Sequence, residues 1–177
     1  LVVTMTEKSV IGVDAKTGEF YWQVKQLQSN KIHANSPVYE NGIIYCSSTS
    51  SREGYSGLLA LELSDDGKSV TQLFRNEEFK NLMGGIVILN ETIYGSAYRT
   101  KNWYSINAKT GEEKLISSDF GGGVIVYAEG LFYCYSEEGE IALVKITPDS
   151  FTIVSKFEVP LGTDQHWAHP VIHEGVL

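Results

Sequence analysis

The sequence is poor in the features that would hold a nucleic acid or cross a membrane. Its 14 lysines and arginines stand against 22 aspartates and glutamates, so the formal net charge is -8 and no basic surface is available for a phosphate backbone. No stretch approaches the roughly 20 consecutive apolar residues of a membrane-spanning helix. We therefore predict no nucleic-acid partner and no transmembrane segment. The chain starts at Leu1 without a secretion-signal pattern, so we expect any targeting signal to lie outside it.

Helical periodicity is also lacking. No window shows a sustained apolar period of 3.6 residues, so we expect essentially no helix. What the chain does contain is a substantial apolar fraction: 42% of its 177 residues are hydrophobic, enough for one folded domain with its own core. These apolar residues come in short runs bounded by glycine, asparagine and aspartate, a pattern typical of β-strands and turns.

The two cysteines reveal an internal repeat. Cys46 and Cys134 each follow an apolar triplet that ends in tyrosine and is preceded by glycine. Related copies end at Tyr94 and, before them, at Val3. The strand ends at Val3, Tyr45, Tyr94 and Tyr133 are separated by 42, 49 and 39 residues. Repeats of this length are typical of solenoids and propellers.

A turn motif recurs at the same period. Asp-Ala-Lys-Thr-Gly occupies residues 14–18 and Asn-Ala-Lys-Thr-Gly residues 107–111, with a looser copy in 59–68 and a decayed one in 143–151. The acidic or amide side chain can bond its own backbone, and glycine supplies a positive φ, so each copy predicts a tight turn between two strands. Asn-Gly at 41–42 is a further hairpin signal within the same module.

Four short strands in a period of about 40 to 50 residues are typical of a β-propeller blade. We predict an all-β chain of about four four-stranded antiparallel blades, with repeat modules at about 1–42, 43–91, 92–130 and 131–177. The first strand of the last repeat would be residues 170–172. Because the chain begins and ends inside the same strand type, both terminal blades would expose a face. We expect self-association through these open blade edges.

These motifs resemble a known family. Asp-Ala-Lys-Thr-Gly-Glu followed by an aromatic residue and Trp22, together with Ser-Pro-Val at 36–38 leading into Asn-Gly, resembles the repeat of propellers related to pyrroloquinoline quinone dehydrogenases. In character the chain is closest to non-catalytic members such as the outer-membrane assembly lipoprotein. The resemblance implies that Trp22 docks one blade against the next, with Leu115 in the matching position after Gly111. It also implies a complete propeller of seven or eight blades, of which this chain would be a segment.

Candidate ligand-binding residues lie in the loops that lead into the first strand of each blade. Alignment of the repeats sets the loop 33–37 opposite 166–170, with glycine-rich loops at 83–85 and 121–123 in the same position of the middle blades. We expect these glycines to leave room at the mouth of a central channel. The candidate ligand-binding residues are His33, Asn35, His166, Trp167 and His169. The alternative interpretation is that they are solvated loop residues serving turn geometry.

Catalytic and metal-binding residues are not recognisable. The quinone dehydrogenases of the resemblance use a calcium-bound quinone, a disulfide between adjacent cysteines and a Trp floor, whereas Cys46 and Cys134 fall two blades apart, beyond the reach of about 7 Å for a disulfide. We predict that both are small buried fillers. Trp167 could form a floor, but only Asp164 lies near it as a carboxylate. His169 and His173 flank a predicted strand, where four residues span about 13 Å, so they cannot share one ion.

Two functional hypotheses follow. The first is a non-catalytic propeller platform that binds a protein or glycan, without a cofactor, at a periplasmic or cell-surface location in a bacterium. The second is a fragment of a quinone-dependent alcohol or sugar dehydrogenase whose catalytic residues lie outside this chain, with pyrroloquinoline quinone and calcium as cofactors. We favour the first, because the resemblance reaches the scaffold residues and not the catalytic ones.

Overall fold

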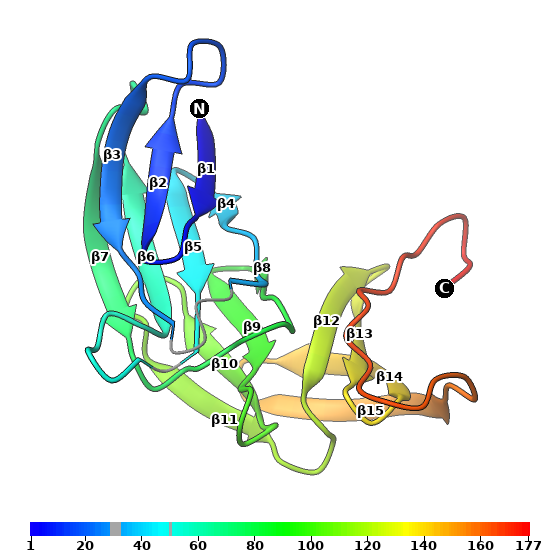
Figure 1. The fold of residues 1–177 in the computed structure, drawn as a ribbon. Helices are drawn as coiled ribbons and strands as arrows, with labels where there is room; N and C mark the ends of the chain where they lie inside the picture. Colours follow the sequence, from blue (N-terminus) through cyan, green and yellow to red (C-terminus); the bar gives the residue numbers. More distant parts are fainter. Residues whose placement is uncertain (29–32, 50) are drawn as a thin grey trace. The chain divides into compact units, whose positions relative to one another are not determined.

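A computed structural model of the chain describes residues 1–28, 33–49 and 51–177 (Figure 1). The described residues form antiparallel sheets joined by turns and loops, and no helix occurs among them. This part of the chain therefore contains no helix that is long and apolar enough to cross a membrane. The all-β prediction is confirmed.

Each sheet is a meander of neighbouring strands. The first sheet consists of β1 (Val2–Met5), β2 (Ser9–Val13) and β3 (Phe20–Lys25), and the second of β4 (Val38–Glu40), β5 (Ile43–Ser47), β6 (Leu58–Leu63) and β7 (Val70–Asn76). The third sheet consists of β8 (Val87–Leu89), β9 (Thr92–Ser96), β10 (Trp103–Asn107) and β11 (Glu113–Ser117), and the fourth of β12 (Gly123–Ala128), β13 (Leu131–Ser136), β14 (Glu140–Thr147) and β15 (Ser150–Glu158).

These four sheets are the blades of a β-propeller segment. They fall into two compact units, the first made of residues 1–82 with 108–112 and the second of residues 83–107 with 113–177. The prediction of four strands per blade is correct for three sheets and wrong for the first, which has three strands in the described residues. Its strands match the second, third and outer strands of the other blades, because β2 and β3 flank the same turn motif as β10 and β11.

The predicted turns are confirmed at all three sites. Asn41 and Gly42 have φ angles of 49° and 85°, and Gly18 and Gly111 both have 75°, conformations that glycine and asparagine adopt readily. In a meander, successive connections lie at alternate ends of the sheet. The tight turns, which join the first strand to the second and the third to the fourth, therefore share one end of each four-stranded blade, the "turn end". The other connections lie at the opposite end, the "loop end". Candidate binding residues lie on the loop end.

Each unit has a large buried apolar cluster among its described residues. In the first unit the buried cluster is aliphatic around a single tryptophan and consists of Val10, Trp22, Ile44, Cys46, Leu59 and Leu61. In the second unit it is rich in aromatic residues and consists of Tyr94, Trp103, Phe120, Ile125, Phe132, Cys134, Ala142, Val144 and Ile146. Both cysteines are free and completely buried, as the filler prediction requires.

Side chains of one sheet dock on the turn of the next. In the first unit the Trp22 indole donates a hydrogen bond to the Gly67 carbonyl at 3.2 Å, and the Tyr45 hydroxyl donates to the Ala108 carbonyl at 3.1 Å. The Phe74 ring lies so close to Gly111 that a Cβ there would overlap it. The docking role that the resemblance implied for Trp22 is thus seen directly.

The matching position in the third sheet is Lys114, and the expectation of Leu115 is wrong. Trp22 pairs with Gly12, whereas the equivalent Ser105 pairs with Lys114. The reason is a shifted β-bulge, which follows Gly12 in β2 but precedes Tyr104 in β10. Lys114 then forms an ion pair with Asp149 in the next turn, while Leu115 stays half exposed.

The strand expected at 170–172 does not form. Only His173 and Val176 make a bridge, across a turn in which Glu174 and Gly175 have φ angles of 49° and 76°. The turn of an inner hairpin is therefore present, but no ladder extends from it because no strand among the described residues lies beside 170–172.

Candidate functional site

The connection from residue 159 to 169 runs along the loop end of the fourth sheet and is tied to it by the backbone. The Val159 amide donates to the Gly139 carbonyl at 2.8 Å, and the His166 amide donates to the Glu137 carbonyl at 3.1 Å. Two bonds from separate points of the connection hold it on the 136–139 loop. The side chains that it presents are therefore held in defined positions.

His166 anchors this connection. Its Nδ1 lies 2.5 Å from the Tyr135 hydroxyl, and the two rings meet edge to face with centroids 5.4 Å apart. The ring also packs on two glycines: a Cβ on Gly139 would lie 3.0 Å from Nε2, and one on Gly162 would lie 2.8 Å from Cε1. Tyr135 itself is buried, so His166 closes the end of a small apolar cluster.

Trp167 follows directly and is 42% exposed. Its side chain hydrogen-bonds the Glu137 carboxylate, which is only 10% exposed and lies 3.9 Å from the Lys101 ammonium. Lys101 also pairs with Glu138. Burial raises the pKa of Glu137, and the Lys101 charge and the Trp167 hydrogen bond oppose that rise. The result is an exposed aromatic ring held beside a partly desolvated charge cluster.

His169 ends the same connection. Its Nε2 lies 3.2 Å from the Met83 carbonyl, and its ring passes close to Gly85, where a Cβ would lie 3.2 Å from Cε1. The side chain remains exposed to solvent. His166, Trp167 and His169 thus lie on one connection of the second unit, and Trp167 and His169 are exposed on it.

The other two candidates, His33 and Asn35, belong to the first unit. Asn35 is buried, and its amide nitrogen donates to Ser47 Oγ at 3.0 Å and Asn81 Oδ1 at 2.5 Å. His33 places Nε2 3.4 Å from the Glu7 carbonyl, and burial lowers its pKa. Asn35 therefore joins a polar network inside the unit rather than an open surface. The sequence carries no signal that distinguishes such a buried loop asparagine from an exposed one.

In the glycine-rich loop at 121–123, two glycines are packed against backbone. A Cβ on Gly122 would meet the Lys101 backbone at 2.7 Å, and one on Gly123 would overlap the Tyr135 carbonyl. Gly123 is also bonded to Ser96 through both its amide and its carbonyl. The expectation of open space is therefore wrong at Gly122 and Gly123, because the protein's own backbone fills it.

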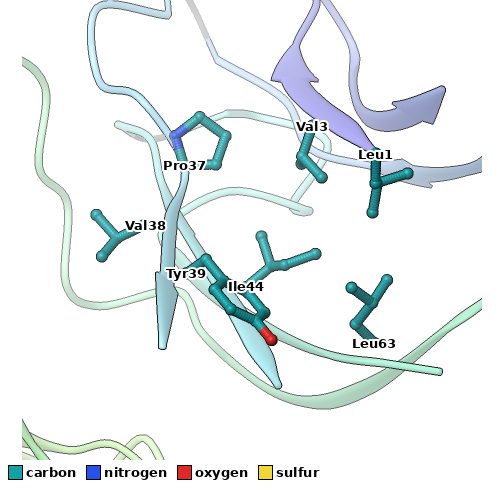
Figure 2. A pocket seen from close by; sticks show the side chains of 7 residues that line it. All are labelled: Leu1, Val3, Pro37, Val38, Tyr39, Ile44 and Leu63. Carbon is teal, nitrogen blue, oxygen red and sulfur yellow. The ribbon is translucent and has the colours of Figure 1, made fainter. Parts of the chain in front are cut away.

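A groove in the first unit escaped the sequence analysis. It has a volume of about 410 Å³ and lies between β1 and the inner strand of the second sheet. Figure 2 shows Val3 of β1 and Leu1, which precedes that strand, on one side of the groove, with Tyr39, Ile44 and Leu63 on the other. The lining is mostly apolar and consists of Leu1, Val3, Pro37, Val38, Tyr39, Ile44 and Leu63. Its residues come from two blades, so only their packing could reveal it.

The groups that quinone chemistry needs are not brought together in the described residues. Cys46 and Cys134 are buried in different sheets and unpaired. Within residues 1–28, 33–49 and 51–177, no three His, Cys, Asp or Glu side chains are grouped to hold a metal ion. The described residues therefore do not fit a calcium-bound quinone.

Comparison with known proteins supports the fold. Among solved structures, the chain is similar to BamB from Moraxella catarrhalis, with a TM-score of 0.64 and 14% sequence identity over 86% of this chain. The fold is a β-propeller. The match spans 43% of the BamB chain, as expected for a partial propeller. No protein-family profile matches the sequence, and no curated protein does.

Proposed function

We propose that this chain belongs to a non-catalytic β-propeller platform that binds a protein partner through the loop end of its fourth sheet. The observation that carries the proposal is Trp167, an exposed ring whose position is held by Glu137 and by the anchored His166. Tryptophan is among the residues that most often dominate a protein interface, particularly when it is held in place before binding.

The surroundings of Trp167 favour a protein over a glycan. The same connection exposes Leu161, whose relative exposure is 77%, so the apolar surface is not limited to a single ring. Lys101 and Glu138 supply charges of both signs nearby, which suits the polar rim of a protein interface. A glycan that stacks on Trp167 alone is the alternative.

The likeness to BamB supports a platform role and an extracytoplasmic location. The family resemblance places an outer-membrane assembly lipoprotein among its non-catalytic members, and BamB shares the fold of this chain. We propose a periplasmic or cell-surface location in a bacterium on that basis. No observation favours the dehydrogenase alternative, and we propose that the chain works without a cofactor.

A comparison of two single variants tests this proposal. The immobilised chain is exposed to bacterial periplasmic extract, and each captured protein is purified and its binding measured by interferometry. Trp167→Ala should weaken binding at least tenfold, whereas Leu161→Ala, on the same connection, should weaken it less. An oligosaccharide panel is run in parallel and read by tryptophan fluorescence, with Trp167→Ala as the reference for the signal of Trp22 and Trp103. Equal binding by wild type and Trp167→Ala, or binding of oligosaccharides alone, would contradict the proposal.

A further inference from the structure

An exposed tyrosine has an unusual backbone conformation at the loop end of the second sheet. Tyr55 lies in the connection between β5 and β6 and has a φ of 56°, a conformation that bulky residues rarely adopt. Two bonds hold it there: the Tyr55 amide donates to Glu77 Oε1 at 2.7 Å, and the Leu27 amide donates to the Tyr55 carbonyl at 2.7 Å. Glycine or asparagine would suit this backbone better, so the turn itself does not require a tyrosine side chain.

The Tyr55 ring lies beside two cations of the first unit. Lys25 Nζ is 4.3 Å from the ring centroid, and Arg75 Cζ is 5.8 Å from it. We call Lys25, Tyr55 and Arg75 the Tyr55 patch. The tyrosine is 48% exposed. Lys25 is exposed as well, and its ammonium lies 3.6 Å from the Glu53 carboxylate. An ion pair between two solvated side chains is weak, so Lys25 can exchange Glu53 for another anion.

Arg75 is the fixed part of the Tyr55 patch. Its Nη2 donates to the Lys25 carbonyl at 2.8 Å, and its Nη1 donates to Gln26 Oε1. Gln26 is completely buried, and its Nε2 donates to Ser48 Oγ at 3.0 Å and to the Gly57 carbonyl at 2.9 Å. The guanidinium is therefore held in one orientation before any partner binds, and both of its acceptors are uncharged.

The positive charge of Arg75 has no carboxylate partner. None of the ion pairs within residues 1–28, 33–49 and 51–177 includes Arg75, although its side chain is partly buried. Burial lowers the pKa of Arg75, and the charge of Glu77 opposes that change. A charge that is withdrawn from water is normally paired with an anion that accepts its hydrogen bonds. The Tyr55 patch lacks this anion, and a ligand can supply it.

A second contact between a tyrosine and a lysine, at the turn end of the same unit, serves the fold alone. Lys68 Nζ lies 5.4 Å from the Tyr21 ring centroid. Tyr21 has the extended backbone of β3, and its hydroxyl donates to Asp14 Oδ2 at 2.9 Å. Lys68 is also close enough to Asp66 to lower the pKa of that carboxyl, although hydrogen bonds from the Lys68 amide and Ser64 lower it more. This contact therefore balances its charges within the chain, whereas the Tyr55 patch does not.

We propose that the Tyr55 patch is a second interaction surface, which binds an acidic segment of a partner protein. A glutamate or aspartate of the partner pairs with Arg75, and the residue next to it packs on the exposed Tyr55 ring. Tyrosine and arginine often dominate protein interfaces, and arginine can bond a carboxylate through two N–H donors. A phosphate site would use backbone amides, but the Tyr55 amide is already bonded to Glu77. The patch lies in the first unit and Trp167 in the second, so this inference goes beyond the proposed function.

Fluorescence anisotropy of a labelled peptide tests the choice of ligand. The probe peptide has glutamates on both sides of a leucine, and the control peptide has glutamines in their place. The 177-residue chain at low salt should bind the glutamate peptide and not the glutamine peptide. Lys25→Gln should weaken binding about threefold, whereas Lys68→Gln, the matched change at the Tyr21 contact, should leave it unchanged.

Four results of this measurement would overturn the proposal. The first two are equal binding of the two peptides and binding of neither. The third is displacement of the glutamate peptide by an equal concentration of inorganic sulfate, which would show a site for small anions. The fourth is tighter binding of an oligogalacturonate than of the glutamate peptide, which would show a site for an acidic glycan.

Exchange of the two tyrosines separates binding from folding. Tyr55→Asn introduces a residue that tolerates the left-handed backbone, so its melting temperature should equal or exceed that of the wild type, while peptide binding falls about fivefold or more. Tyr21→Asn should melt at a lower temperature, because it loses the bond to Asp14 and suits a strand poorly, and should bind the peptide as the wild type does. A Tyr55→Asn variant that melts below the wild type and still binds the peptide would assign the ring to the fold and overturn the proposal.

Discussion

The two units fill the space between their sheets with a large aromatic ring that comes from a different strand in each unit. In the first unit the large ring comes from the outer strand, where Trp22 packs over Gly12 and bonds Gly67. In the second unit it comes from the third strand of the blade, where Trp103 is fully buried and donates to the Phe120 carbonyl at 3.1 Å. Trp103 also lies 5.5 Å from the ring centroid of Phe151.

The exchange is clear when equivalent positions are compared. Val10 and Trp103 each stand four residues before the aspartate or asparagine of the turn motif, and both are completely buried. Trp22 has Lys114 as its counterpart in the third sheet. Each unit therefore places one large buried ring between its sheets, but the ring belongs to a different strand of the blade. The repeat conserves the backbone and the total packing rather than the size at each position.

The largest expected effect comes from removing the ring of the second unit. Trp103→Ala should cost about 3 to 5 kcal/mol of unfolding free energy, because it leaves a cavity beside Phe120 and Phe151. Val10→Ala, at the equivalent position, should cost about 1.5 to 3 kcal/mol. Urea unfolding followed by circular dichroism measures both. Equal losses of unfolding free energy would contradict the conclusion that Trp103 fills more of the interior of its unit than Val10 does.

The next effect comes from filling the space under the Trp22 ring. Gly12→Ala should cost about 1 to 3 kcal/mol, since a Cβ at this position overlaps an indole held by its bond to Gly67. The third sheet carries Ser105 at the equivalent position without such a ring above it. In a Trp22→Phe background the cost of Gly12→Ala should fall. A double-mutant cycle measures this coupling, and strict additivity would contradict direct contact.

A smaller effect is expected from pH, because the turn at 14–18 begins with a titratable Asp14 whereas the turn at 107–111 begins with Asn107. Asp14 Oδ1 accepts from the amides of Lys16 and Thr17, both at 2.8 Å, and Oδ2 accepts from the Tyr21 hydroxyl at 2.9 Å. The Thr17 amide, the Lys16 amide and then Tyr21 hold the pKa of Asp14 well below its ordinary value of 3.8. Its contribution to stability is therefore present above that value and is lost as the pH falls through the lowered pKa.

The variant that tests this copies the other turn, which has Asn107 at this position. Asp14→Ala should lower the melting temperature at pH 7, and the difference from wild type should shrink below about pH 4. Asp14→Asn keeps an oxygen that can accept the two backbone bonds but loses the charge, so it should melt between wild type and Asp14→Ala at pH 7. A pH-independent gap between wild type and Asp14→Ala would show that the charge of Asp14 is not involved.

The smallest effect concerns a feature that the two units share, a buried cysteine. Cys46 and Cys134 share one position of the repeat and are both completely buried. Burial raises the pKa of Cys46 to about 12 and that of Cys134 well above its ordinary value. Neither thiol should react with Ellman's reagent in the folded chain at pH 8, and both should react after unfolding in guanidinium. Rapid labelling of one cysteine alone would show that its unit opens locally.

Local sequence patterns predicted the strands and turns because those depend on neighbouring residues. The Asp14 turn uses its own backbone amides, and the Asn41 turn uses a conformation that asparagine and glycine adopt without help. The bulge that places Lys114 rather than Leu115 opposite Ser105 was not predictable. Its position depends on how β10 and β11 pack, and both registers satisfy the local pattern.

For the candidate site, the sequence located the loops but not the roles of their side chains. It singled out His166 and Trp167, yet the partners that hold them, Tyr135 and Glu137, lie on a different strand and loop. It treated Asn35 as equivalent to these residues, although Asn35 is buried against Asn81. Repeat alignment compares positions along the chain and carries no information on which loop residues meet in space.

The sequence by itself therefore determined the all-β class, the blade repeat and its tight turns, because each depends on residue types within one hairpin. Only the tertiary structure decided which strand supplies the large ring of each interior, which glycines are crowded by backbone, and that an apolar groove lies beside β1. The physical reason is that packing acts on the space between sheets. That space is filled in part by residues far apart in the sequence, such as Trp22 and Gly67, which are 45 positions apart. Several arrangements of large and small side chains can fill it.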